Sequence, residues 1–108
     1  MVVSTEQSRK NKIARGRTSE GAPNPIDVYV GCRIRERRTF LKISQEEMGE
    51  ILGISYQQIQ KYEKGNNRIS ASRLWDLAQV LEVSVEYFFA GMDKETVSRS
   101  PRKLQQNI

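Results

Sequence analysis

The sequence contains no histidine and a single cysteine, Cys32. It therefore has no Cys/His cluster for structural zinc, no intramolecular disulfide and no imidazole for acid–base catalysis. No apolar run approaches the roughly 18 residues of a membrane-spanning helix, and the N-terminus lacks the apolar segment of a signal peptide. These absences favour a protein of the reducing cytoplasm with no cofactor, no metal and no catalytic centre.

The formal net charge of +5 is unevenly distributed along the 108 residues. Residues 1–25 carry five Lys/Arg and two Glu, residues 93–108 carry four and two acidic residues, and the segment between them carries nine of each sign. A basic excess favours nucleic acid through phosphate attraction. Here the excess lies in the two ends, so any cations that bind DNA from the middle segment must be clustered.

The composition predicts three segments. Residues 1–24 are polar, with almost no apolar periodicity, which is typical of a disordered basic arm. Its cations either stay solvated or add phosphate or minor-groove contacts: Arg9, Lys10, Lys12, Arg15 and Arg17. Residues 25–91 are the expected folded domain. Residues 92–108, too short for a second domain, are expected to be a flexible tail.

Two short helices joined by a tight turn are predicted at 45–64. Ser44 with Glu47, and Ser55 with Gln58, have the S-x-x-E/Q spacing of capping boxes, in which side chains satisfy the free N–H groups of a helix start. Gly53 and a second glycine at 65 supply the left-handed residue that commonly follows a helix. The helices are therefore expected over 45–52 and 56–64.

Each of these two helices has one apolar face, and the faces are expected to pack together with an Ile54 plug in the turn. Gly49 would let the second helix cross closely, because it has no side chain. The residues of the first face are Met48, Ile51 and Leu52, and those of the second are Ile59 and Tyr62.

Three further helices complete an all-α prediction. Asn24-Pro25 is an N-cap followed by a proline suited to the first helical position, and an apolar stripe continues through Ile26, Val30, Ile34 and Leu41. Its arginines at 33, 35 and 37, with Lys42, are expected to lie mostly outside. Four serines, each after a β-branched apolar residue, predict helix starts with hydrophobic staples: Ser44, Ser55, Ser70 and Ser84.

This pattern resembles the helix-turn-helix of the phage repressor/Cro-like (Xre) family of transcriptional regulators. The resemblance covers about Ile26 to Gly91, including SQEE, KYEKG, LWDLAQVLEVS and SVEYFF, and YQQIQKYEKGNNRISASRLW is similar to a bacterial subgroup of single-domain regulators. It implies a compact five-helix, lambda-repressor-like domain. The implied function is sequence-specific binding of double-stranded DNA, as a repressor in the cytoplasm and nucleoid.

The outward face of helix 56–64 has the chemistry for reading bases, because glutamine pairs with adenine and lysine reaches guanine or phosphate. The resemblance places base contacts on this helix and phosphate contacts on both sides of it. The expected base-contact residues are Tyr56, Gln57 and Lys61, with Ser55, Gln58 and Gln60 as neighbours. The expected phosphate contacts are Gln45, Asn66, Asn67, Arg68, Ser70 and Ser72.

Two structural roles are also implied by the resemblance. Arg38 is expected to form an ion pair with Glu63, linking the first helix to the end of the base-reading helix. The last helix is expected to form a two-fold homodimer contact, which would place two base-reading helices on a pseudo-palindromic operator. The dimer residues would be Val85, Glu86, Tyr87 and Phe89.

Two other classes of function stay open. The chain would be an interaction module if its last helix binds a toxin or another protein antagonist, which exposed aromatic residues at 75, 87 and 89 would favour. An enzyme is the weaker alternative, because the acidic residues have no histidine, metal cluster or phosphate-cradling glycine loop beside them. DNA regulation is the reading that the residues support best.

Overall fold

A computed structural model of the protein describes residues 22–99. These residues contain five α-helices and one 3-10 helix: α2 (Pro25–Phe40), α3 (Gln45–Leu52), α4 (Tyr56–Lys64), α5 (Ala71–Leu81), η1 (Val85–Phe88) and α6 (Lys94–Ser98). The all-α fold class predicted from the sequence is confirmed.

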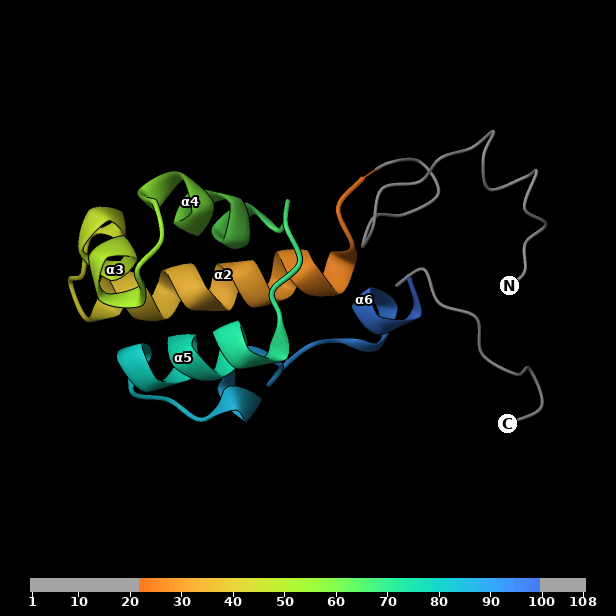
Figure 1. Ribbon diagram of the computed structural model, residues 1–108. Coiled ribbons are helices and arrows are strands. Elements are labelled where there is room, and N and C mark those ends of the chain that lie inside the picture. Colours follow the sequence, from red (N-terminus) through yellow and green to blue (C-terminus); the bar gives the residue numbers. More distant parts are fainter. Residues whose placement is uncertain (1–21, 100–108) are drawn as a thin grey trace, which may run out of the picture.

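The longest helix, α2, is the one around which the others are arranged (Figure 1). α4 packs along one side of α2, α5 and η1 pack along the other, and α3 contacts both α4 and α5. α2 begins where expected, because the Asn24 side chain accepts a hydrogen bond from the Ile26 N–H at 2.8 Å and Pro25 occupies the first turn. Of the pair α3–α4, α4 packs directly on α2, and α3 packs on α4 and α5.

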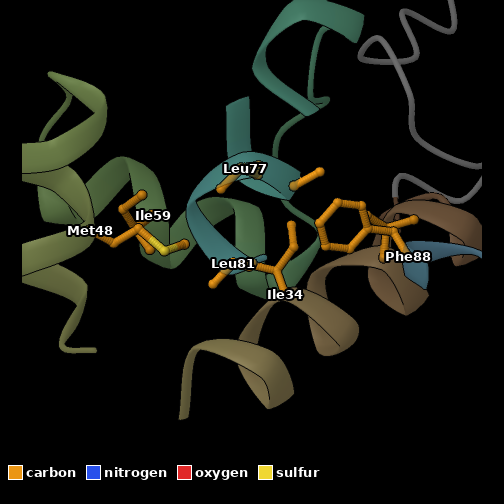
Figure 2. Close-up of a cluster of buried hydrophobic side chains, with 8 residues drawn as sticks. Ile34, Met48, Ile59, Leu77, Leu81 and Phe88 are labelled. Carbon is orange, nitrogen blue, oxygen red and sulfur yellow. The ribbon is translucent and has the colours of Figure 1, made fainter. Parts of the chain in front are cut away.

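The buried side chains between these helices form one core (Figure 2). It draws on α2, α3, α4, α5 and η1, and each fully buried Leu, Ile, Met or Phe contributes about 1.5–3 kcal/mol relative to exposure. The apolar stripe expected on α2 is confirmed, because Val30 and Ile34 are buried and Ile26 and Leu41 pack against the core. Its members are Val30, Ile34, Met48, Ile59, Leu77, Ala78, Leu81 and Phe88.

One residue expected in the α3–α4 seam is on the surface. Ile51 is 61% exposed, whereas Met48 and Gly49 are buried and Leu52 packs against the core. Successive residues of an α-helix are turned by about 100°, so an arc centred between Met48, Gly49 and Leu52 leaves Ile51 on its far edge. The prediction of a shared face was wrong at this position.

The predicted serine caps are present at three helices. The Ser44 hydroxyl accepts from the Glu47 N–H at 2.9 Å, and the Glu47 carboxylate accepts from the Ser44 N–H at 2.7 Å, which makes a complete capping box. Ser55 and Ser70 each accept from the N–H three residues on. In the described part of the chain only the Ser44 pair forms both bonds, so the second predicted box is half formed.

Ser84 stands at the start of η1 but its side chain makes no capping bond. The Tyr87 N–H donates to the Ser84 carbonyl at 3.0 Å, as is typical of a 3-10 turn. The prediction of a fourth serine cap was therefore wrong, although the helix begins where it was expected.

Two arginines expected outside are partly buried and join helices. Arg33 Nε donates to the Tyr87 carbonyl at 3.0 Å, and Arg37 Nε donates to the Leu81 carbonyl at 2.8 Å. Both carbonyls lie at helix C-termini, where backbone acceptors lack intrahelical partners. The side chains of α2 thus tie α5 and η1 to it, which spacing along the sequence did not indicate.

The folded part continues beyond residue 91, so the flexible tail predicted from residue 92 was wrong over residues 94–98. Asp93 caps α6 by accepting from the Thr96 N–H at 2.7 Å, and α6 packs against α2. The Tyr29 hydroxyl also donates to the Ala90 carbonyl. Residues 1–21 of the predicted arm and 100–108 of the predicted tail lie outside the described residues.

Candidate nucleic-acid interface

The turn between α3 and α4 is held by two glycines. Gly53 ends α3 with φ 75°, a backbone angle that side chains disfavour. Gly49 lies so close to the turn that an added Cβ would stand 2.6 Å from the Ile54 carbonyl oxygen. The Ile54 N–H donates back to the Gly49 carbonyl at 2.9 Å. The close crossing expected at Gly49 is present, and it brings the start of α4 directly beside α3.

α4 buries one face and exposes another. Ile59 is fully buried and Tyr62 is buried, so the helix is anchored on α2 and α3 by its inner face. Tyr56, Gln57 and Lys61 are exposed. Of the other residues expected to read bases, Ser55 is exposed but its hydroxyl caps α4, while Gln58 and Gln60 are partly buried. The structure therefore brings the predicted residues together on one helix.

The exposed charge of α4 has one sign. Lys61 and Lys64 are exposed, and the only acidic residue of the helix, Glu63, is buried against Arg38. The positive charge of Arg38 compensates the negative charge of Glu63, which would otherwise repel a polyanion. The surface that α4 presents is thus a set of uncharged donors and acceptors flanked by two ammonium groups.

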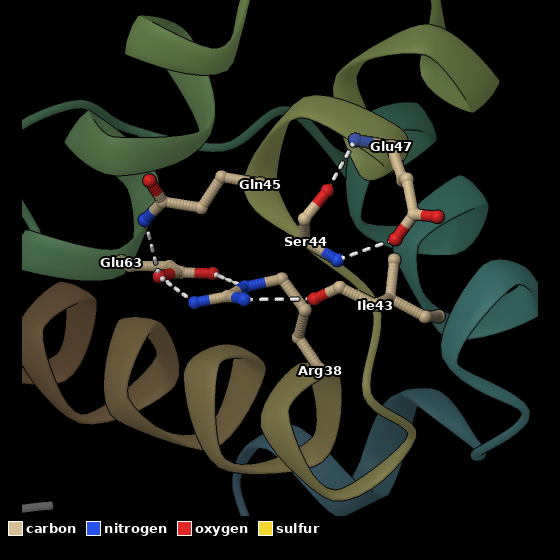
Figure 3. A network of polar contacts seen from close by, with 6 residues as sticks. All are labelled: Arg38, Ile43, Ser44, Gln45, Glu47 and Glu63. Atoms are coloured by element: carbon tan, nitrogen blue, oxygen red, sulfur yellow. Dashed lines mark hydrogen bonds and ion pairs between the residues drawn. The ribbon is translucent and has the colours of Figure 1, made fainter.

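The ion pair between Arg38 and Glu63 is present, with side chains 12% and 4% exposed. Arg38 Nε lies 2.6 Å from Glu63 Oε2 and Arg38 Nη2 lies 3.1 Å from Oε1, a two-pronged contact (Figure 3). Arg38 Nη1 also donates to the Ile43 carbonyl at 2.8 Å. One guanidinium thus joins α2, the loop before α3 and the end of α4.

Gln45 joins the same network, which the sequence did not indicate. Its Nε2 donates to Glu63 Oε1 at 3.0 Å (Figure 3). The side chain was expected to contact phosphate from the start of α3, and it stands there, partly buried beside Ser44. It also lines a shallow groove whose other walls include Arg35, Gln60 and Lys64.

The other predicted phosphate residues lie in the loop between α4 and α5 and at the start of α5. Asn66, Arg68, Ser70 and Ser72 are exposed and Asn67 is partly buried. Ser70 caps α5, and its hydroxyl lies 3.3 Å from that of Ser72. The helices before and after α4 in sequence are α3 and α5. The free N–H groups at the start of each of these two helices favour an anion.

A partly buried carboxyl stands close to this loop. Burial raises the pKa of Asp27, in the first turn of α2, above its ordinary value of 3.8, while the charge of Arg68 acts in the opposite direction. The effect of burial is the larger of the two. The charged form of Asp27 is thus disfavoured by its partial burial, and it interacts with Arg68, one of the predicted phosphate contacts.

The four residues expected at a dimer contact are unequally accessible. Glu86 and Phe89 are exposed, whereas Val85 and Tyr87 are partly buried and pack against the core. The guanidinium of Arg33 lies 3.8 Å from the centre of the Tyr87 ring. Tyr87 is therefore occupied within its own chain, and Phe89 is the larger free apolar surface of the set.

Sequence reasoning missed Gly31, in the middle of α2. A Cβ added there would stand 2.6 Å from the Glu63 carbonyl oxygen, so α4 crosses α2 at this residue. A signal was available in the sequence, because a glycine inside a helix costs about 1 kcal/mol of stability relative to alanine. A glycine at such a position commonly marks a close packing contact.

The described residues give no indication of a membrane or metal site. None of their helices is long and apolar enough to cross a bilayer. No group of three or more metal-binding side chains occurs among residues 22–99.

Two short helices joined by a glycine turn, of which the second presents a polar and basic face to solvent, have the architecture of a helix-turn-helix domain, whose second helix enters the major groove of DNA. The chain belongs to the Helix-turn-helix family, whose sequence pattern matches residues 34–88. That match begins inside α2 and ends with η1, so it includes α3, the turn and α4.

The chain is similar to uncharacterized HTH-type transcriptional regulators of rhizobia. Proteins of Sinorhizobium medicae and Rhizobium meliloti are each 64% identical to it over 67 residues, which are 62% of this chain and 48% of each relative. An uncharacterized transcriptional regulator in the ATPase CF(0) region of Rhodospirillum rubrum is 52% identical over 69 residues, 64% of each chain. The chain thus spans about half the length of the rhizobial relatives.

Solved structures of similar fold include two regulators. The restriction-modification controller protein C.AhdI from Aeromonas hydrophila is 28% identical, with a TM-score of 0.56 over 58% of this chain and 96% of that chain. The clp gene regulator ClgR from Corynebacterium glutamicum matches the fold with a TM-score of 0.60 over 70% of this chain and 78% of its own, at 21% identity.

Proposed function

We propose that this protein represses transcription by binding a specific sequence of double-stranded DNA, with α4 in the major groove. The observation that carries the proposal is the exposed face of α4, which is polar and basic while its only carboxylate is buried in an ion pair. Membership of the Helix-turn-helix family, and the similarity to proteins named transcriptional regulators, support the same function.

Base reading falls to the first two turns of α4. Gln57 is the main reader, because an exposed glutamine amide donates and accepts at once and so matches the edge of adenine. Tyr56 and Lys61 are exposed beside it, where a ring meets a thymine methyl and an ammonium meets guanine or phosphate. Ser55, whose hydroxyl caps α4, and the partly buried Gln58 and Gln60 complete the contact set.

Phosphate contacts hold α4 in register from both sides. Gln45 stands at the start of α3, and the remaining contacts come from the α4–α5 loop and the start of α5. Contacts of this kind position the protein on the duplex and carry no sequence information directly. The loop and α5 residues are Asn66, Asn67, Arg68, Ser70 and Ser72.

Two copies bind together through the segment that follows α5. Phe89 is 39% exposed there, beside Glu86, Val85 and Tyr87. A two-fold pair of such domains would place its α4 helices in successive major grooves, about 34 Å apart, on a pseudo-palindromic operator. C.AhdI, whose fold is similar, is named a restriction-modification controller protein.

The test is selection of bound DNA from genomic fragments, including the promoter of its own gene, at several salt concentrations. Gln57→Ala is compared with wild type, and Gln79→Ala, an exposed glutamine of α5, is the matched control. We expect wild type and Gln79→Ala to recover one short inverted repeat. Gln57→Ala should lose discrimination at one base pair per half-site, a loss of about tenfold or more.

The contrary result is binding that falls uniformly and steeply with salt and that Gln57→Ala leaves unchanged. That outcome would assign the binding to non-specific phosphate attraction. Transcription from the recovered promoter should fall when the protein is added, and a rise would contradict the repressor role.

The dimer is tested separately by sedimentation equilibrium with and without the operator. Phe89→Ser should weaken self-association. Phe40→Ser changes a more exposed phenylalanine, the last residue of α2, and should leave self-association unchanged. Equal behaviour of the two variants would move the dimer contact away from residues 85–89.

A further inference from the structure

We propose that Glu63 orients the side chain of Gln45 for contact with a DNA phosphate, so that the buried ion pair takes part in DNA binding as well as in joining helices. This inference rests on the proposed function. Glu63 would act as a positioning residue, since its side chain is 4% exposed and, within residues 22–99, its hydrogen-bond partners are Arg38 and Gln45.

The carboxylate of Glu63 is shared between two donors. Arg38 binds both of its oxygens, at 2.6 and 3.1 Å, and Gln45 Nε2 binds Oε1 at 3.0 Å (Figure 3). An ionised carboxylate has about four acceptor sites and no donor. It therefore attracts the amino end of the Gln45 amide and repels its carbonyl end, which excludes the flipped orientation.

The amide nitrogen of Gln45 has two hydrogens, and Glu63 uses one of them. Glu63 leaves the other hydrogen unused, and Gln45 lines the groove that Arg35 and Lys64 also line. Arg35 and Lys64 are both exposed. An anion that enters this groove meets a fixed amide donor and two cationic side chains, a set of groups that suits a backbone phosphate of DNA.

Holding Gln45 before DNA arrives has a thermodynamic consequence. A free surface glutamine loses rotamer freedom when a ligand immobilises it, and that loss weakens binding. In this structure the immobilisation has already occurred on folding, because the network of α2, α3 and α4 holds the amide. Removal of the Glu63 charge should restore the cost and weaken binding about two- to tenfold.

The sign of this effect separates positioning from simple electrostatics. Removing a negative charge from a DNA-binding protein ordinarily strengthens binding. Glu63→Gln should do the reverse, because one carboxylate oxygen becomes an NH2 group that donates instead of accepting, and the neutral amide holds Arg38 and Gln45 less firmly. Glu82→Gln, which removes the charge of an exposed glutamate after α5, is the matched control and should bind equally or more tightly.

The experiment is a double-mutant cycle on affinity for the recovered operator, with wild type, Gln45→Ala, Glu63→Gln and the double variant. We expect each single variant to bind about two- to tenfold more weakly than wild type. In the Gln45→Ala background, Glu63→Gln should add no further loss, because the residue through which it acts is gone. Equal losses from Glu63→Gln in both backgrounds would overturn the proposal.

A second measurement leaves Glu63 intact, in case its variant does not fold. Each operator phosphate is replaced in turn by an uncharged methylphosphonate, and wild type is compared with Gln45→Met. One phosphate per half-site should matter to wild type and cease to matter to Gln45→Met. An unchanged phosphate pattern would overturn the inference, whereas failure of wild type to select any sequence would overturn the proposed function instead.

Discussion

Gly31 of α2 lies against the carbonyl oxygen of Tyr62 in α4, so closely that a single added carbon would overlap it. The same carbon would stand 2.6 Å from the Glu63 carbonyl oxygen. Both atoms belong to the backbone of α4. A side chain could rotate away from the added carbon, but in a closely packed interior these backbone atoms can move only if the helix moves with them. The height of α4 above α2, and hence the placement of its outer face, depends on this glycine.

Gly31→Ala should therefore destabilise the domain by about 1–3 kcal/mol, the usual cost of forcing an extra carbon into a packed site. That loss lowers the melting temperature by about 4–8 °C for each kcal/mol in a domain of this size. Thermal unfolding followed by circular dichroism measures it directly.

The neighbouring residue provides the control. Cys32 is exposed on the same helix, so Cys32→Ala should change stability by no more than about 0.5 kcal/mol. Gly31→Ala with wild-type stability would contradict the prediction, because it would show that the crossing of α2 and α4 accommodates the added carbon without loss.

The ion pair of Arg38 and Glu63 should show strong coupling in stability. Arg38→Met leaves a nearly buried carboxylate without its main partner, a loss of about 3–5 kcal/mol. The double variant Arg38→Met with Glu63→Met should lose less than the sum of the two single variants, since apolar packing replaces a buried pair at small cost. Urea unfolding of the four proteins gives the coupling.

Additive losses would contradict this expectation and would mean that each side chain acts through separate contacts. For Arg38 the separate contact is its bond to the Ile43 carbonyl, which Glu63 does not share. A variant with lysine at 38 keeps the charge but lacks the two-pronged geometry, and it should recover only part of the loss.

The local signals of the sequence predicted the local structure well. The signals that mark a helix start lie within about four residues of one another, because the capping serine and the N–H group that it accepts from are three residues apart. The starts of α3, α4 and α5 could therefore be predicted to the residue. The Arg38–Glu63 pair, 25 residues apart, was available only through family resemblance.

Contacts between distant residues account for most of what was missed. Nothing in the spacing of Arg33 or Arg37 shows that a helix C-terminus from α5 or η1 lies within their reach. The outward turn of Ile51 similarly depends on which side of α3 receives α4. The base-reading and phosphate residues are gathered at one helix and its flanks, but their contacts with DNA stay predictions.

The two kinds of serine at helix starts should differ in stability. Ser44→Ala removes both the hydroxyl acceptor and the reciprocal partner of Glu47, which should cost about 1 kcal/mol. Ser84→Ala removes a hydroxyl without a capping bond, so the change should stay within about 0.5 kcal/mol. Denaturant titrations compare them, and equal losses would show that Ser84 caps η1 in solution.

Asp27 should make stability depend on pH in an unusual direction. Burial raises the pKa of its carboxyl above 3.8, against the weaker influence of Arg68. Folding therefore favours the protonated form, so the contribution of Asp27 is fully present below pH 3.8 and is lost as the pH rises through the folded-state pKa. At neutral pH the charged carboxylate lowers the stability of the fold.

Asp27→Asn keeps the shape of the side chain and removes this charge, so at pH 7 it should melt at a higher temperature than wild type. The difference should shrink as the pH falls toward 4, because wild type then becomes neutral at the same position. Asp76→Asn, which changes an exposed aspartate of α5, serves as the control and should show no such closing gap. If Asp27→Asn instead melts lower at pH 7, the attraction of the carboxylate to Arg68 and to the first turn of α2 outweighs its burial.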